Sequence, residues 1–551
     1  MNGRQRVAVV TGGGTGIGAA IAEDLGAKGW YVVTVDPLVT LTGAEQLPEP
    51  EETTAGRIVA AGGTARASGI SVTDAGAVQG LFDELVDERG GLDAVVNVAG
   101  ITRQTGFAHG DEGDWQAVLN VHLGGHLNVV GAALPLMAKG GHGRILGVTS
   151  GSGWRAADAG AYSCAKRAIA SLTWQLGRQA PPEVAVNAMS PMAATRMVAA
   201  ALERAQREHG TSSGGGISLA SMPGPEYLGP LGAHLVGDGF GWCRGQVLFA
   251  GGTEVAVVDE PRLLEVVRTD GVTSLARVVE AAVPRALGRA EKAQVSGGGA
   301  NPRFGAIFDE PASEPERSAE VQTCVLVSDR PDLAGALTSA LEGRSITCHR
   351  VDPVHGFAAT SEALRAAAAS AGPVDAVVVA PAAPRSSGRS GGEGWERTLA
   401  EHRGLLEELH SDASWARAVA DYAAATERPV RLVTLTDATT PAGRSRAQVA
   451  AQLARVGGST TEGRVTAFAA SVEGAARETA GPTAELAAHL LTHPDAGALA
   501  GAELVVGVGW LGLRSHPRPA CSVSYGGPAV PDWLDTTLRE VVGARAPVGE
   551  R

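Results

Sequence analysis

The stretch VAVVTGGGTGIGAAIAEDLGAKGWYVVTVDP, residues 7–37, decides the fold. It opens with a short apolar run typical of a buried strand, passes through a glycine-rich turn into a helix-like segment, and ends in a second apolar run. Further apolar runs alternate with helix-like segments: LDAVVNVAG (92–100), GRILGVTS (143–150), EVAVNAMS (183–190) and GQVLFAGG (245–252). Such alternation predicts an α/β fold with a doubly wound parallel sheet and helices on both of its faces.

The pattern begins again in the second half of the chain. TCVLVSDRPDLAGALTSALEGRSITCHRVDP, residues 323–353, aligns on residues 7–37 without a gap. Later landmarks also recur: VDAVVVAPA (374–382) matches LDAVVNVAG, RLVTLTD (431–437) matches RILGVTS, and Trp395, His402 and Gly404 match Trp115, His122 and Gly124. We therefore expect an internal repeat, with two Rossmann-type sheets in tandem.

Between the two copies, residues 296–320 combine glycines, prolines and acidic residues, which is the composition of a linker. We predict a first domain over residues 1–292, with its core ending near 260 and extra helices after it. A linker over 293–320 and a second domain over 321–545 follow. A chain of 551 residues is long enough to divide in this way.

Composition restricts the cellular setting and the partners. The formal net charge is −13 and there is no basic stripe, so we expect binding neither to nucleic acid nor to a membrane surface. The five cysteines are scattered, which predicts no disulfide framework and no zinc ribbon. No run of about 18 apolar residues occurs, so neither a signal peptide nor a membrane span is expected. These features favour a cytoplasmic protein.

The turn TGGGTGIG (11–18) predicts a nucleotide site. It lies between a strand and a helix, where glycines allow the backbone to approach a pyrophosphate and the helix N-terminus offers free N–H groups. Glycines also form ordinary turns, but Asp36 ends the following strand, where a carboxylate can bind ribose hydroxyls and repel a 2′-phosphate. This favours NAD(H), with NADP(H) as the alternative; an Asp36 that is merely solvated is the other interpretation.

AGAYSCAKRAIA (159–170) carries the reactive pair, Tyr162 and Lys166. With four lysines and five tyrosines in the chain, this spacing is a rare coincidence. On a helix the two residues share a face, and we expect the ammonium to lower the phenol pKa, making an acid–base group. The echo AGRSRAQVAAQL (442–453) lacks both residues. The second copy also replaces Gly12, Gly16, Gly18 and Asn97 by Ser328, Asp332, Ala334 and Val379, so it is predicted to lack cofactor and catalytic motifs.

Together, TGGGTGIG, NVAG (97–100), Ser150 and YSCAK (162–166) resemble the short-chain dehydrogenase/reductase family over residues 1 to about 260. The segment VVNVAGITRQTGF is most similar to (3R)-hydroxyacyl-CoA dehydrogenase domains and 3-oxoacyl reductases. This resemblance implies that Tyr162 is the acid–base group, that Lys166 also holds the nicotinamide ribose, and that Ser150 binds the substrate oxygen. The cofactor residues it implies are Gly12, Thr15, Gly16, Ile17, Gly18, Asp36, Ser71, Asn97, Ala99, Gly100, Tyr162, Lys166 and Thr195.

Two positions depart from the family pattern. Counting back from the tyrosine selects Thr149, whereas the local Ser-x-Ser-Gly pattern selects Ser150, with Ser152 close by; we favour Ser150. His122 stands where most members have an asparagine whose main-chain carbonyl anchors a water in the proton relay. The imidazole either accompanies that relay as a fourth catalytic residue or packs in the core.

Two further features bear on ligands. His122 and His126 have a spacing that can chelate a metal on a helix, but Gly124 and Gly125 between them and the missing glutamate argue against it, so we predict no metal. Residues 198–240 stand where the family has its substrate lid. Their glycines and serines suggest either a mobile cover or a surface insertion.

We thus expect an NAD(H)-dependent enzyme interconverting a secondary alcohol and a ketone, on a hydroxyacyl, acyl-thioester or natural-product substrate. An NADPH-dependent ketoreductase of secondary metabolism and a non-catalytic NAD-sensing scaffold are the alternatives. The second copy is expected to supply in cis the surface that another subunit would supply, so that a homodimer acts as a pseudo-tetramer. Its rival role is to bind a different ligand.

Overall fold

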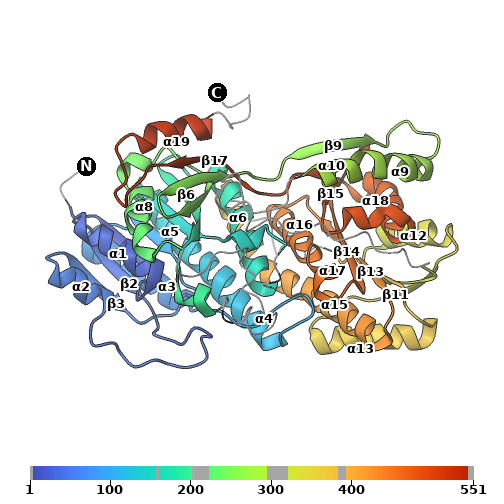
Figure 1. The fold of residues 1–551 in the computed structure, drawn as a ribbon, viewed down its shortest axis with the longest axis horizontal. Helices are drawn as coiled ribbons and strands as arrows, with labels where there is room; N and C mark the ends of the chain where they lie inside the picture. The colour runs from blue at the N-terminus through green and yellow to red at the C-terminus, as the bar shows by residue number, and fades with distance from the viewer. Residues whose placement is uncertain are drawn as a thin grey trace.

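The computed structural model describes residues 4–156, 158, 160–200, 203, 222–294, 321–382 and 393–543. These residues form two β-sheets, one toward each end of an elongated molecule, and helices pack between the sheets (Figure 1). The predicted linker (293–320) and most of the predicted lid lie outside the described residues.

The first sheet has nine strands in the order β17-β8-β7-β6-β5-β4-β1-β2-β3. The strands from β7 to β3 are parallel, while β8 and β17 pair antiparallel at one edge. The strands are β1 (Val7–Thr11), β2 (Tyr31–Val35), β3 (Thr64–Ser68), β4 (Ala94–Asn97), β5 (Gly143–Val148), β6 (Val184–Met192), β7 (Val247–Gly251), β8 (Glu254–Val258) and β17 (Pro519–Ser524). The first-half helices are α1 (Gly16–Ala27), α2 (Thr54–Ala60), α3 (Ala75–Arg89), α4 (Glu112–Leu119), α5 (Gly125–Gly140), α6 (Gly160–Gln179), α8 (Gly229–Leu235), α9 (Leu275–Val283) and α10 (Arg289–Ala293).

The second sheet has eight strands in the order β11-β10-β12-β13-β14-β15-β16-β9. Among the described residues this repeats the order of the first sheet, except that β3 has no counterpart there. The strands are β9 (Leu263–Arg268), β10 (Thr323–Val327), β11 (Thr347–Val351), β12 (Ala376–Val379), β13 (Val430–Asp437), β14 (Val465–Glu473), β15 (Glu503–Gly507) and β16 (Trp510–Arg514). The helices are α12 (Pro331–Glu342), α13 (Phe357–Ala371), α14 (Gly394–His402), α15 (Leu405–Thr426), α16 (Pro441–Ala454), α17 (Gly457–Thr460), α18 (Ala476–Thr492) and α19 (Leu534–Gly543).

The two halves exchange their edge strands. β9 leaves the first half and pairs with β16, and β17 returns from the second half to pair with β8 (Figure 1). Helices follow the strands: Val279 and Val283 of α9 are buried in the second core, and Leu534 and Leu538 of α19 in the first. The first sheet therefore includes a strand from beyond residue 321, and the second sheet includes a strand from before residue 292. The predicted domains, divided at 292 and 321, assigned each of these strands to the other half. The segment after residue 260 was expected to be helical, yet it begins with a strand whose partner lies about 245 residues away.

The interface between the halves is a continuous apolar core. One cluster of buried side chains extends from Val9 and Trp115 in the first half to Val377 and Trp415 in the second. In the middle of the molecule α6 packs against α16, and α4 and α5 contact α15 and α14 (Figure 1). The two helices that the sequence repeat relates, 159–170 and 442–453, are thus brought into direct contact.

The first half contains one unusually apolar helical run. α4, a π-helical turn (Asn120–Gly124) and α5 form a continuous stretch, Glu112–Gly140, which by length and composition could cross a membrane, with a hydropathy of 1.3. Of this window 67% is buried inside the structure. Its apolar side chains pack into the core between the halves.

Candidate functional site

The glycine turn after β1 leads directly into the first turn of α1. Gly12 and Gly16 have positive φ angles of 62° and 58°. A Cβ on Gly18 would lie 2.2 Å from the Gly12 carbonyl oxygen, so only glycine permits this approach of helix to turn. A Cβ on Gly16 would meet nothing within 4 Å, which leaves room beside the first turn of the helix. N–H groups at such a helix start can bind an anion.

Thr15 and Ile17 lie at the start of α1, next to the glycine turn. Thr15, the N-cap of α1, makes no capping bond with its side chain and instead accepts a hydrogen bond from Arg196 Nη2 at 2.8 Å. Ile17 packs its side chain against the core of the first sheet. Arg196 comes from the segment after β6, and sequence reasoning missed it because 181 residues separate it from Thr15.

Asp36 lies directly beside the turn at the end of β2. Its Oδ2 accepts a hydrogen bond from Gly14 N at 3.1 Å and its Oδ1 accepts one from Leu38 N at 2.9 Å. A Cβ on Gly14 would approach Oδ2 to 2.6 Å, so the carboxylate and the glycine turn are packed against each other. Ser71 lies farther along this edge, in the turn before α3, where its hydroxyl bonds the Thr73 hydroxyl at 2.8 Å.

A buried polar chain forms the floor of the site at the end of β4. Thr11 Oγ1 donates to Asn97 Oδ1 at 2.5 Å and accepts from Ala99 N at 3.2 Å. Asn97 Nδ2 contacts His126 Nδ1 at 3.0 Å. Burial, followed by the charge of Lys166, lowers the pKa of His126 to about 3, so the imidazole is neutral and can accept this bond. Asn97, at the end of β4, is thereby held by Thr11 at the end of β1 and by His126 on α5.

His122 lies in the π-helical turn with its ring against Tyr162. The two rings meet edge to face, with centroids 5.0 Å apart. His122 Nε2 lies 2.8 Å from the Ile101 carbonyl oxygen and 3.2 Å from the Ile101 N, and burial lowers the pKa of the imidazole to about 3. A Cβ on Gly100 would lie 2.4 Å from the His122 ring, so Gly100 makes room for it. His122 and His126 are held by different partners, Ile101 and Asn97, rather than presented together.

The structure brings Tyr162, Lys166 and Ser150 together. On α6, Lys166 Nζ lies 5.5 Å from the Tyr162 ring centroid and donates to the Val148 carbonyl at 2.7 Å. The Ser150 hydroxyl hydrogen-bonds the Tyr162 phenol, which lowers the pKa of the phenol. Thr149, the alternative from strict counting, donates to the Lys166 carbonyl at 2.7 Å. Ser150 is therefore the hydroxyl that contacts the phenol.

The electrostatics of the pair differ from the expected pattern. Burial raises the pKa of Tyr162 above 10.0, and the Ser150 hydrogen bond and the Arg155 charge only partly oppose this. Burial also lowers the pKa of Lys166 to about 7. The expected depression of the phenol pKa by Lys166 is wrong for this structure, because burial of the phenol outweighs the groups that lower its pKa, and the Lys166 Nζ is turned toward the Val148 carbonyl. Arg155, missed from the sequence, is the cation that acts on the phenol.

Thr195 follows β6 at the same edge of the sheet. Its hydroxyl accepts a hydrogen bond from Val198 N at 3.3 Å, as in a helix N-cap. The predicted lid continues from here, and its residues 201–202 and 204–221 lie outside the described residues.

The glycine turn, Tyr162, Lys166 and Ser150 thus lie at the carboxyl ends of β1, β4 and β5, which is the edge where α/β sheets bind ligands. They define a Rossmann-like α/β protein in which a tyrosine, a lysine and a serine lie together at the same edge of the sheet as a glycine-rich turn. The family model described as short chain dehydrogenase matches residues 6–206. A relative, the short-chain reductase protein NovJ of Streptomyces niveus, is 38% identical over 203 residues, 36% of this chain and 74% of that protein. This chain belongs to the short-chain dehydrogenase family and is an oxidoreductase acting on CH–OH groups.

Two other similarities extend the comparison. The peroxisomal hydratase-dehydrogenase-epimerase of Neurospora crassa is 32% identical over 253 residues, 43% of this chain and 25% of that protein. The crystal structure of the N-domain of a bacterial malonyl-CoA reductase, solved with NADP, matches with a TM-score of 0.63 and 16% identity. That match covers 91% of this chain and 97% of the other, so the shared fold spans both halves.

Proposed function

We propose that the first half interconverts a secondary alcohol and a ketone with NAD(H), on a hydroxyacyl, acyl-thioester or natural-product substrate. The observation that carries the proposal is the contact of Ser150 and Lys166 with Tyr162 beside the glycine turn. The named relatives, a short-chain reductase and a peroxisomal hydratase-dehydrogenase-epimerase, support the reaction class.

The residues present fit a dinucleotide. The open space at Gly16 and the start of α1 suit a pyrophosphate, and Arg196 donates to Thr15 there. Asp36 would accept hydrogen bonds from the adenosine ribose hydroxyls, and Lys166 would hold the nicotinamide ribose. When bound, the dinucleotide accepts or supplies the hydride.

The chain's own groups handle the proton. In reduction the Tyr162 hydroxyl donates its proton to the carbonyl oxygen of the substrate, and in oxidation the phenolate accepts the proton of the alcohol. Ser150 donates a hydrogen bond to the same oxygen and orients it. The charge of Arg155 favours the phenolate. His122, neutral and packed against the phenol ring, limits its movement.

Asp36 is expected to determine the choice of cofactor. For the wild type we expect kcat/KM to be higher with NADH than with NADPH, because the carboxylate repels a 2′-phosphate. In Asp36→Ser this NADH/NADPH ratio should fall about tenfold, which corresponds to about 1.4 kcal/mol. Steady-state rates at 340 nm with each cofactor measure the ratio. Asp74→Ser, which removes another carboxylate of the first half but keeps a capping hydroxyl, should leave it unchanged; a wild type that prefers NADPH contradicts the assignment.

We further propose that the second half is a degenerate copy of the family fold that supports the first half in cis. The matching strand orders and the packing of α16 on α6 support this. Ser445, aligned with Tyr162, is fully buried between the halves. It donates to Ser171 Oγ at 3.0 Å and contacts Gln175 Nε2 at 3.0 Å and His402 Nε2 at 2.8 Å. The position that Tyr162 occupies in the first half is thus occupied in the second half by a serine that makes hydrogen bonds across the interface.

Ser445→Tyr tests this supporting role. A phenol has no room at a buried serine, so we expect overpacking to cost about 1 to 3 kcal/mol and to lower the first half's kcat. Urea unfolding and steady-state kinetics of the full chain give both quantities. Ser339→Tyr, on the exposed side of α12, should change neither. If the two variants behave alike, the second half does not support the first, and its rival role as a separate ligand-binding module is favoured.

The same proposal includes the assembly. Because the second half occupies the place of another subunit, two chains would form a pseudo-tetramer, which we propose to be cytoplasmic. Light scattering should then give the mass of a dimer, and a monomer would contradict this assembly.

A further inference from the structure

The loop after Ser150 is enclosed between the two halves. It begins with the 3₁₀ turn Gly151–Gly153. On one side it presses on the catalytic helix α6: a Cβ on Gly153 would lie 3.0 Å from Arg167 N, one residue beyond Lys166. Trp154 follows and is only 1% exposed. A side chain at position 153 would be tightly packed, because the turn lies directly on the helix backbone.

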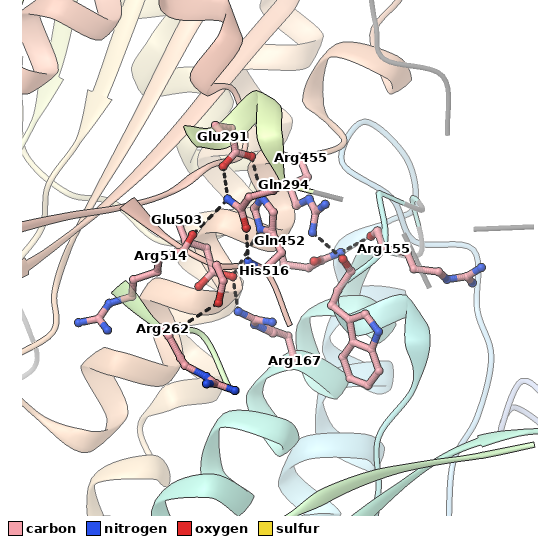
Figure 2. A network of polar contacts seen from close by, with 12 residues as sticks. Arg155, Arg167, Arg262, Glu291, Gln294, Gln452, Arg455, Glu503, Arg514 and His516 are labelled. Atoms are coloured by element: carbon pink, nitrogen blue, oxygen red, sulfur yellow. Dashed lines mark hydrogen bonds and ion pairs between the residues drawn. The ribbon is translucent and has the colours of Figure 1, made fainter. Parts of the chain in front are cut away.

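On its other side the loop is held by two side chains of the second half. Gln452 Nε2, on α16, donates to the Ser152 carbonyl at 3.2 Å. It also donates to the Arg155 carbonyl at 2.7 Å (Figure 2). Arg455 Nη1 donates to the Trp154 carbonyl at 2.5 Å. Gln452 is only 3% exposed, so water does not readily replace these bonds. The second half thus satisfies three carbonyls in a stretch of four residues.

A direct path leads from these bonds to the catalytic hydroxyl. The Ser152 N–H donates to Ser150 Oγ at 3.3 Å, while the Ser152 carbonyl accepts from Gln452. A displacement of Ser152 therefore moves the group that orients the Ser150 hydroxyl. The Gln452 side-chain amide also donates to the carbonyl of Arg155. Arg155 is the residue whose guanidinium charge acts on Tyr162.

We propose that Gln452 and Arg455 of the second half are positioning residues for the active site of the first half. They hold residues 151–155 against α6 and thereby aim the Ser150 hydroxyl at the Tyr162 phenol. This inference rests on the proposed function, which assigns Ser150 to the substrate oxygen. The copy without catalytic motifs then acts on the geometry of the reaction as well as on stability, and a misplacement of about 1 Å can lower a rate about 10²-fold.

Gln452→Leu in the full chain tests the proposal, since leucine fills much of the same volume without donating. We expect kcat to fall about tenfold with the KM for NADH unchanged, and amide hydrogen exchange in residues 150–156 to accelerate. Gln448→Leu, one turn earlier on α16 and facing the cavity lined by Glu473 and Arg514, is the matched control and should alter neither. A normal kcat together with normal exchange in Gln452→Leu overturns the proposal.

Arg455 supplies a second, independent variant. Arg455→Met should lower kcat, whereas Arg455→Lys keeps a donor for the Trp154 carbonyl and should retain most of it. Equal loss in both variants would show that the guanidinium acts through its packing or charge and not through this bond, and would remove Arg455 from the proposal.

A double-mutant cycle with Ser150→Ala identifies the route of the effect. If Gln452 acts through Ser150, adding Gln452→Leu to Ser150→Ala should lower kcat no further, while additive losses overturn the positioning role. If Ser150→Ala itself leaves kcat unchanged, the proposed function of Ser150 fails. Hydrogen exchange in residues 150–156 still reports in that case whether Gln452 holds the loop, so the two failures are distinguishable.

Discussion

Tyr162→Phe should lower kcat about 10²- to 10⁴-fold, the usual contribution of a positioned general acid or base. Phenylalanine keeps the ring contact with His122 but removes the hydroxyl that bonds Ser150. We propose that this hydroxyl exchanges the proton with the substrate. Lys166 does not replace it, because its Nζ is turned toward the Val148 carbonyl. The loss should therefore appear in kcat, with binding of the dinucleotide retained.

The measurement is turnover at 340 nm on a panel of acyl-thioesters and secondary alcohols, with NADH affinity measured by calorimetry. Tyr422→Phe is the control: its hydroxyl accepts Val374 N at 2.9 Å in the second half, so kcat should stay at the wild-type value. A Tyr162→Phe enzyme within threefold of wild type would show that another group transfers the proton. A wild type that binds NADH but turns over no substrate of the panel would favour the sensing scaffold.

Much of the fold followed from local patterns. The apolar runs at 7–11, 92–100 and 143–150 all contain strands of the first sheet, because strands buried on both faces are continuously apolar. The exchange of β9 and β17 could not be predicted in this way. LLEVVR and PACSVS carry no strong strand signal of their own, and each is a strand because a partner from the other half offers it a free sheet edge.

In the candidate site, too, local sequence patterns identified some residues and missed others. Tyr162 and Lys166 are related by helix spacing, and Asp36 by its distance from the glycine turn, so the sequence located them. Arg155 and Gln452 could not be found, because their roles depend on contacts between segments that are far apart in sequence. The sign of the Tyr162 pKa shift was missed for a related reason: spacing reports the neighbouring amine but not how deeply both groups are buried.

Glu503→Leu should destabilise the whole chain by about 3 to 5 kcal/mol, since it leaves the Arg167 guanidinium buried without its counter-ion. Arg167 follows Lys166 on α6, is 1% exposed, and forms an ion pair with Glu503 on β15, which is 8% exposed (Figure 2). Burial would raise the pKa of Glu503, but Arg167 and His516 outweigh it and hold the pKa below 4.5, so the carboxylate is charged at neutral pH. The ion pair thereby connects α6 to the second sheet.

The companion variant separates the pair from its surroundings. In Arg167→Met combined with Glu503→Leu no charge remains unpaired, and apolar replacement of a buried ion pair is often neutral, so most of the stability should return. Arg514→Met breaks the partly exposed pair with Glu473 and should cost less than about 1 kcal/mol. Urea unfolding of the full chain measures all three. A Glu503→Leu chain no less stable than Arg514→Met would show that the guanidinium finds water or another acceptor, and that α6 is held to the second half by its apolar contacts alone.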